Sequence, residues 1–280
     1  MRDDALAAAI RKANGEGRCG RIPYVTGGFP TPHAFWDVLS ELCDNGADIV
    51  EIGVPFSDPV ADGPVVAEAG RRALEEGVTL RWLLEGLSRR KFSAPLVLMS
   101  YANPLVQYGW AEAAGAAAPG GGPYGAGGVL PKSLGILASA AKAASVAGAI
   151  VPDLPLEESG PFREAFSAEG IDLIPLVGPN TGAARMKEYL PSARGYVYVV
   201  SVLGITGMRK GLPPEAEETL KRARQVFDIP LALGFGIKEP SQLDGIASPP
   251  DAVIFGSALL RHLADGGSAK DFMAPWISGS

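Results

Sequence analysis

Eight short runs rich in Val, Ile and Leu recur along the chain, and each is followed by a turn and then by a stretch with helical spacing. Because these runs are apolar on both faces, they indicate parallel strands in a sheet that helices cover. The predicted strands are IPYVT from Ile22, DIVEI from Asp48, PLVLM from Pro95, GAIVP from Gly148, DLIPLV from Asp172, GYVYVV from Gly195, PLALGF from Pro230 and AVIFG from Ala252.

Helices are predicted between these strands from apolar residues that recur every three or four positions. The first is predicted to begin with Thr31 as its N-cap and Pro32 at the first helical position, and Asn45-Gly46 ends it. The apolar positions are Phe35, Val38, Leu39 and Leu42 in this helix, Ala216, Leu220, Ala223 and Phe227 in a later helix, and Phe162, Ala165 and Phe166 in a shorter one.

Eight βα units in about 250 residues are the number that closes a (β/α)8 TIM barrel, whose active site lies at the C-terminal strand ends. We therefore expect one α/β barrel domain over residues 1–280, with an extra helix at the N-terminus. A doubly wound open sheet is the alternative. Periodicity alone does not separate the two, but such a sheet more often has its phosphate-binding turn after the first strand. Here the glycine-rich strand ends come late in the chain.

One segment breaks the βα pattern. From Gly109 to Gly135 the chain reads GWAEAAGAAAPGGGPYGAGGVLPKSLG, which has little apolar material to pack and much glycine. We expect a flexible insertion at about 111–134, between the third strand and its helix.

Charge and composition exclude several kinds of partner. The net charge of −6 and the lack of any Lys/Arg run longer than Arg89-Arg90-Lys91 argue against nucleic acid. Residues 1–18 lack the apolar core of a secretory signal, and no run of eighteen apolar residues could span a membrane. We therefore expect a cytoplasmic protein, in which Cys19 and Cys43 are reduced thiols.

The residues that are scarce limit the chemistry. The only histidines are His33 and His262, so a His-ligated metal site is not expected, and a solvated or packing role suits both better. None of the predicted strands contains a lysine, which disfavours a Schiff-base aldolase. Carboxylates remain as the candidate catalytic groups.

Glu51 stands inside an apolar strand, between Val50 and Ile52. Burying an ionisable group there is costly unless the group has a partner or a task. Burial would raise its pKa toward neutrality, which suits a residue that both gives and takes a proton. A buried ion pair is the structural alternative.

Asp62 lies in the loop GVPFSDPVADGP, residues 53–64, which prolines stiffen. An Asp before Gly63-Pro64 is most often a turn residue or a helix N-cap. On spacing alone, capping is favoured over catalysis.

Glycines at the ends of the last three strands indicate a phosphate site. The segments are SVLGITGMRKG from Ser201, LGFGI from Leu233 and FGSAL from Phe255. Gly256-Ser257 opens a helix, where free N–H groups and the positive end of the helix dipole favour an anion. Barrels often bind phosphate at strands seven and eight.

The segment VEIGVPFSDPVADGP, from Val50 to Pro64, resembles the signature of the tryptophan synthase alpha subunit family. Further matches follow in order over about Ile22 to Leu263: PYVTGGFP from Pro23, LMSYANPLVQYG from Leu98, IVPDLPLEES from Ile150, YVVSVLGITG from Tyr198, GFGI from Gly234 and GSAL from Gly256.

This resemblance implies cleavage of indole-3-glycerol phosphate to indole and glyceraldehyde 3-phosphate. It makes Glu51 the general acid/base and Asp62 the acceptor for the indole N–H. It also implies that Tyr198 lies beside Glu51 and that Thr206 orients Asp62. Tyr24, Tyr101 and Phe235 would wall the indole pocket, and the phosphate would be held by Gly207, Gly236, Gly256 and Ser257.

The same resemblance implies a beta subunit as partner, in an α2β2 complex that receives the indole. Pyridoxal phosphate is expected on that subunit and not on this chain, which has no strand-end lysine for an aldimine. Two rival interpretations remain: a phosphosugar isomerase or epimerase on the same barrel, and a non-catalytic subunit that binds the phosphate ligand to activate its partner.

Overall fold

The computed structural model describes residues 4–114, 129–200, 214–234, 237, 239–243, 246 and 249–278. Its strands form one parallel sheet in the order β5-β4-β3-β2-β1-β9-β8-β7-β6. They are β1 Gly20–Thr26, β2 Val50–Gly53, β3 Leu96–Met99, β4 Val146–Ile150, β5 Asp172–Leu173, β6 Leu176–Val177, β7 Val197–Val200, β8 Leu231–Gly234 and β9 Ala252–Phe255.

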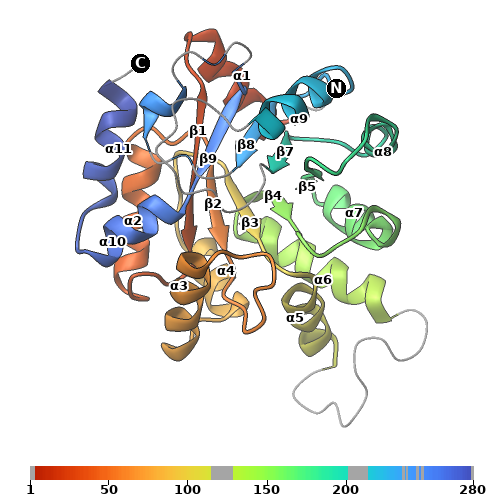
Figure 1. The fold of residues 1–280 in the computed structure, drawn as a ribbon. Coiled ribbons are helices and arrows are strands. Elements are labelled where there is room, and N and C mark those ends of the chain that lie inside the picture. The colour runs from red at the N-terminus through yellow and green to blue at the C-terminus, as the bar shows by residue number, and fades with distance from the viewer. Residues whose placement is uncertain are drawn as a thin grey trace.

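The two outermost strands of that order, β5 and β6, belong to one extended segment, residues 172–177. Pro175 lies between them and cannot donate a ladder hydrogen bond. The amide of Ile174 donates to the Ala149 carbonyl, and the amide of Tyr198 donates to the Pro175 carbonyl, each across 2.9 Å. This segment therefore joins β4 to β7 and closes the sheet into an eight-stranded barrel, visible as the curled sheet in Figure 1. The barrel is confirmed and the open sheet is wrong.

Helices surround the barrel wall (Figure 1). The apolar stripes predicted from the sequence face inward: Phe35, Leu39 and Leu42 are fully buried. No helix in the described ranges is long and apolar enough to cross a membrane. The helices are α1 Ala5–Gly15, α2 Ala34–Asp44, α3 Pro64–Glu75, α4 Leu80–Ser88, α5 Ala102–Ala114, α6 Val129–Ala143, α7 Gly160–Ala168, α8 Ala183–Tyr189, α9 Pro214–Arg224, α10 Ser257–Ala264 and α11 Ala269–Ser278, with the 3-10 turns η2 Leu156–Glu158 and η3 Pro240–Leu243.

The start of α2 differs from the prediction. The helix begins at Ala34, and Pro32 lies in the preceding turn. The Thr31 side chain nevertheless accepts a hydrogen bond from the Ala34 amide across 3.2 Å. Thr31 thus supports the helix entrance as predicted, but from a turn outside the helix.

The extra helix predicted at the N-terminus is α1, which closes the bottom of the barrel. Its Leu6 and Ile10 join the apolar cluster inside the barrel, and both are fully buried. Because the parallel strands all run away from this end, their C-terminal ends meet at the opposite mouth. The other members of the cluster are Ile22, Ile49, Val97, Ile150, Ile174, Tyr196, Ala232, Ala252 and Ile254.

The predicted insertion at 111–134 is too wide at both ends. Helix α5 continues to Ala114 and α6 begins at Val129, so the tract joins two helices that follow β3 rather than a strand and its helix. Ser133 and Leu134 of α6 are buried. A Cβ on Gly109 would lie 1.9 Å from the Ser133 carbonyl oxygen, so this glycine allows α5 to approach α6 closely. The remaining part of the insertion, 115–128, lies outside the described residues.

Candidate active site

Strand β2 carries Glu51 into the interior of the barrel. Side chains alternate along a strand, so Glu51 faces the same way as Ile49, one layer nearer the mouth. Val50 and Ile52 face outward and pack in the core beneath the helices. Glu51 is 0% exposed. The predicted burial of this carboxyl group is confirmed.

The two carboxyl oxygens of Glu51 differ in their surroundings. Oε1 accepts a hydrogen bond from the Tyr196 hydroxyl across 2.6 Å, whereas Oε2 is buried and has no hydrogen-bond partner among the described residues. Burial raises the pKa of Glu51 to about 8, although the Tyr196 hydrogen bond lowers it in part. No ion pair to Glu51 is present in the described part of the chain, so the ion-pair alternative gains no support.

Two tyrosines occupy space that strand-end glycines leave open. Tyr24 is the neighbour of Glu51 in the β1–β2 register, and a Cβ on Gly53 would lie 1.9 Å from the Tyr24 hydroxyl oxygen. A Cβ on Gly234 would lie 2.2 Å from the Tyr198 ring. Burial raises the pKa of Tyr198 well above its ordinary value, and the charges of Glu51 and Asp62 raise it further. The charges of both carboxyl groups act on Tyr24 and on Tyr198, so both tyrosines lie near Glu51 and Asp62.

Asp62 lies on the loop after β2, where it is half-buried. Burial raises the pKa of Asp62 to about 6, although a hydrogen bond from Tyr101 lowers this pKa in part. The Tyr101 hydroxyl also accepts from the Ala61 amide across 2.9 Å, which holds the loop beside Asp62. Gly63 takes the N-cap position of α3. The capping role that spacing favoured for Asp62 is therefore wrong, because a tertiary contact with Tyr101 engages the side chain instead.

A small hollow at the barrel mouth is lined by Asp62 together with Tyr24 and Tyr101. Its volume is about 10 Å³, roughly room for one water molecule. A cavity of about 380 Å³ lies nearby, so size alone would place a ligand there. The smaller hollow, in contrast, is lined by Asp62 and by Tyr24, the strand neighbour of Glu51, so the candidate catalytic carboxyl groups lie at this hollow. Its lining consists of Tyr24, Val54, Asp62, Met99, Ser100, Tyr101 and Pro152.

The predicted phosphate site is described in part. Gly256 follows β9 as the N-cap of α10, and the exposed Ser257 begins that helix. The first-turn amides have no partner within the helix and lie at the positive end of its dipole. A Cβ on Gly256 would lie 2.8 Å from the Tyr24 ring, so this helix end is next to the aromatic wall. The other predicted site residues, Thr206, Gly207, Phe235 and Gly236, lie outside the described residues.

Tyr196 was missed at the level of sequence. The run GYVYVV places Tyr196 and Tyr198 on the same face by alternation, and this signal could have drawn attention to both.

Other expectations concern residues away from the mouth. The Nε2 atom of His262 donates a hydrogen bond to the Ser268 carbonyl across 3.0 Å, and His33 is exposed. Cys19 and Cys43 are free thiols. No cluster of metal-binding side chains occurs in the described ranges.

A (β/α)8 barrel with two carboxyl groups of raised pKa at its mouth is typical of an enzyme that uses acid–base chemistry. Comparison with known proteins gives its family. The family model described as "Tryptophan synthase alpha chain" matches residues 10–274. The chain belongs to the tryptophan synthase alpha chain family.

Individual relatives agree in sequence and in structure. The tryptophan synthase alpha chain of Nitratidesulfovibrio vulgaris (strain DP4) is 55% identical over 278 residues, which cover 99% of both chains. Tryptophan synthase subunit alpha from Legionella pneumophila str. Paris superposes with a TM-score of 0.76 at 28% identity, covering 96% of this chain and 94% of the other. A chain of ligand-free tryptophan synthase from M. tuberculosis superposes with a TM-score of 0.78 at 29% identity, covering 96% and 98%.

Family membership fixes the reaction. The chain is a lyase that catalyses the alpha reaction of tryptophan synthase, the retro-aldol cleavage of indole-3-glycerol phosphate to indole and glyceraldehyde 3-phosphate. The phosphosugar isomerase and the non-catalytic subunit are thereby set aside.

Proposed function

We propose that Glu51 and Asp62 divide the acid–base work of this reaction. Glu51 serves first as the acid and then as the base, and Asp62 stabilises the charge on the indole nitrogen. The position of Glu51 carries the proposal: the side chain is wholly buried inside the barrel, with one oxygen held by Tyr196 and the other without a partner in the described structure. Such an oxygen can exchange a proton with a bound substrate.

In the first step, Glu51 protonates C3 of the indole ring. With a pKa of about 8, Glu51 is mostly protonated at neutral pH, which this step requires. The new C–H bond leaves positive charge at the ring nitrogen. Asp62, with a pKa of about 6, is mostly ionised at the same pH and accepts a hydrogen bond from the N–H. Two carboxyl groups in different surroundings thus take different roles.

In the second step, the Glu51 carboxylate removes the proton from the hydroxyl on the side-chain carbon attached to the ring. That oxygen forms the aldehyde C=O bond as the bond between this carbon and C3 breaks. The electron pair of the broken bond returns to the ring, so the charge at nitrogen disappears and indole is released. Glu51 ends protonated, as it began, so no external acid or base is consumed.

The remaining site residues bind the substrate. Tyr24, Tyr101 and Phe235 form the wall against the indole ring, and Tyr198 lies beside Glu51. Thr206 orients Asp62. The phosphate is held mainly by backbone N–H groups, and the amides at the start of α10 support this assignment. The phosphate-binding residues are Gly207, Gly236, Gly256 and Ser257.

The indole product passes to a beta subunit that carries pyridoxal phosphate, within an α2β2 complex. The family name supports this proposal, since it describes one chain of a larger synthase. This chain itself uses no cofactor, because the ring protonated at C3 is the electron sink for the cleavage.

Indole release by the purified chain tests the division of roles. The assay compares the parent protein with Glu51→Gln, which keeps the size of the side chain, and with Glu76→Gln, an exposed control at the end of α3. We expect Glu51→Gln to lose about 10²-fold or more in rate, as removal of a general acid/base does. Binding of glycerol 3-phosphate should be unchanged. A Glu51→Gln protein with over half of the parent activity would exclude Glu51 from the mechanism.

A further inference from the structure

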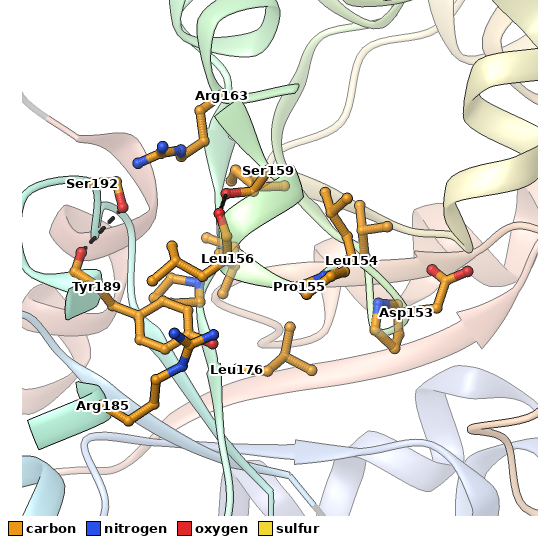
Figure 2. Close-up of a pocket in the computed structure, with 15 residues that line it drawn as sticks. Asp153, Leu154, Pro155, Leu156, Ser159, Arg163, Leu176, Arg185, Tyr189 and Ser192 are labelled. Atoms are coloured by element: carbon orange, nitrogen blue, oxygen red, sulfur yellow. Dashed lines mark hydrogen bonds between the residues drawn. The ribbon is translucent and has the colours of Figure 1, made fainter. Parts of the chain in front are cut away.

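The cavity of about 380 Å³ opens between the segment after β4 and helices α7 and α8 (Figure 2). β4 pairs with β5 only at Gly148 and Ala149, and β6 pairs with β7 alone. Nearer the mouth, β4 and β6 are thus not joined by strand pairing, which leaves an opening between them. Residues from both sides of this opening line the cavity, and its volume lies in the range of small-molecule sites.

The walls of the cavity are mostly apolar. A few polar side chains interrupt them, which is the usual composition of a site that binds an organic molecule. In Figure 2, Arg163 and Ser192 lie at one end and Asp153 lies at the other. The apolar lining comprises Val151, Pro152, Leu154, Pro155, Leu156, Leu173, Ile174, Pro175 and Leu176.

Arg163 is the cation in this lining that has no anionic partner among the described residues. Its Nε atom is buried and has no hydrogen-bond acceptor there. The other lining arginine, Arg185, donates to Glu157 across 2.6 and 2.8 Å and to Glu188 across 2.5 Å. Because Arg163 lines the cavity as a cation with no anionic partner among the described residues, its guanidinium would attract an anion in the cavity.

The neighbouring groups restrict the charge of such an anion. Ser159 donates its hydroxyl proton to the Leu156 carbonyl across 2.6 Å, and Ser192 donates to the Tyr189 carbonyl across 3.1 Å, as dashed lines show in Figure 2. These two protons are in use, and Arg185 is already paired with Glu157 and Glu188, so Arg163 is the cation in the described lining that an anion can pair with. Asp153 at the far end would repel a second negative group. A single carboxylate fits, because it can accept two parallel hydrogen bonds from a guanidinium.

We propose that this cavity binds a small amphipathic carboxylate, with the carboxylate on Arg163 and the apolar part against Leu156 and Leu176. The site adjoins the active site without overlapping its carboxyl groups, since Pro152 lines both this cavity and the hollow that contains Asp62.

Binding of 3-phenylpropionate to the full chain, followed by ligand-observed NMR, tests the proposal. The neutral 3-phenylpropionamide and inorganic phosphate supply the apolar part and the anion separately. We expect the carboxylate to bind at least about tenfold more tightly than either probe, because the amide lacks the charge that strengthens a hydrogen bond to Arg163 and phosphate lacks the apolar part. Equal affinity for the acid and the amide would overturn the proposal.

Variants of the chain locate the bound molecule. Arg163→Met, which keeps an apolar stem, should weaken binding at least about tenfold. Arg89→Met is the matched control, since it removes one positive charge from an exposed site at the end of α4. Leu156→Glu should block binding from the opposite wall while Arg163 stays intact. Saturating glycerol 3-phosphate should not displace the probe. Displacement, or full affinity in Arg163→Met, would place the probe elsewhere and refute the site.

Discussion

The Tyr196 hydroxyl donates a hydrogen bond to Oε1 of Glu51 across 2.6 Å inside the barrel. Both side chains are 0% exposed. The hydrogen bond favours the ionised carboxylate, whereas burial favours the neutral acid, and burial has the larger effect on the pKa of Glu51. Tyr196 therefore limits how far that pKa rises. In the proposed mechanism, this pair sets the pH range in which Glu51 can both give and accept a proton.

The pH dependence of kcat/KM should be bell-shaped. The proposed mechanism needs Glu51 protonated and Asp62 ionised at the start of the reaction. Activity should fall above a pH of about 8, where Glu51 loses its proton, and below a pH of about 6, where Asp62 gains one. Steady-state indole release between pH 5 and 9 measures both limbs. A profile that stays flat across this range would contradict the assigned protonation states.

Tyr196→Phe should move the alkaline limb to higher pH. The substitution keeps the buried ring but removes the donor that stabilises the Glu51 carboxylate, so the pKa of Glu51 rises further. A hydrogen bond to a charged group is worth about 1.5–3 kcal/mol, which corresponds to a shift of about one to two pH units. The acid limb, assigned to Asp62, should not move. An unchanged alkaline limb would show that this hydrogen bond does not tune the acid.

The position of Glu51 could be predicted from sequence, but its partner could not. Alternation along a strand needs only local information, and it places Glu51 on the same face as Ile49. Tyr196 is 145 positions away. Which strand faces Glu51 across the barrel depends on how the sheet closes through residues 172–177, and no local pattern encodes that closure.

Tertiary contacts also overturned two local expectations. The Asp-Gly-Pro sequence at Asp62 favours a cap, yet Tyr101 from the next βα unit engages this side chain. Glycine and alanine weakened the helix prediction around Gly109 and Ser133, yet α5 and α6 pack on each other there. In the second case, the absence of a side chain on Gly109 permits the close contact between α5 and α6. Glycine therefore favours the packing of these helices, although it disfavours helix formation by itself.

Asp62→Asn should lower kcat far more than it raises KM. Asparagine can still accept a hydrogen bond from the indole N–H, but it cannot offset the positive charge that develops there. Loss of one such electrostatic contact costs about 10²- to 10³-fold in rate. Asp37→Asn on the exposed face of α2 is the matched control and should keep the parent rate. If Asp62→Asn raised KM alone, the residue would contribute to binding only.

Glu51 should make the free energy of unfolding fall as pH rises. Its pKa is about 8 in the folded chain against an ordinary value of 4.5, so between these values the folded chain holds a proton that the unfolded chain has released. The contribution is complete below the ordinary pKa and is lost as pH rises toward 8. The loss should reach up to about 1.4 kcal/mol per pH unit.

Urea unfolding at pH 6, 7 and 8 isolates this effect when the parent is compared with Glu51→Gln. Asp62 and Asp172 also have raised pKa values, of about 6 and about 7, and both titrate in the two proteins alike. The difference in slope therefore belongs to Glu51. Equal slopes in the two proteins would contradict a raised pKa for this residue.

Leu6→Ala should destabilise the barrel without changing its chemistry. Leu6 is fully buried in the cluster that α1 shares with the lower barrel interior, at the end opposite the mouth. Removing most of such a side chain costs about 2–5 kcal/mol, because the cavity left behind is not refilled completely. Leu190→Ala is the control; that side chain is 42% exposed, and we expect a loss below about 1 kcal/mol.

Chemical denaturation gives the free energy of unfolding of both variants. Indole release, measured at a temperature where both variants are folded, should match the parent. A normal stability for Leu6→Ala would mean that α1 does not hold the bottom of the barrel closed, and a slowed reaction in a folded variant would show that packing at this end reaches the active site.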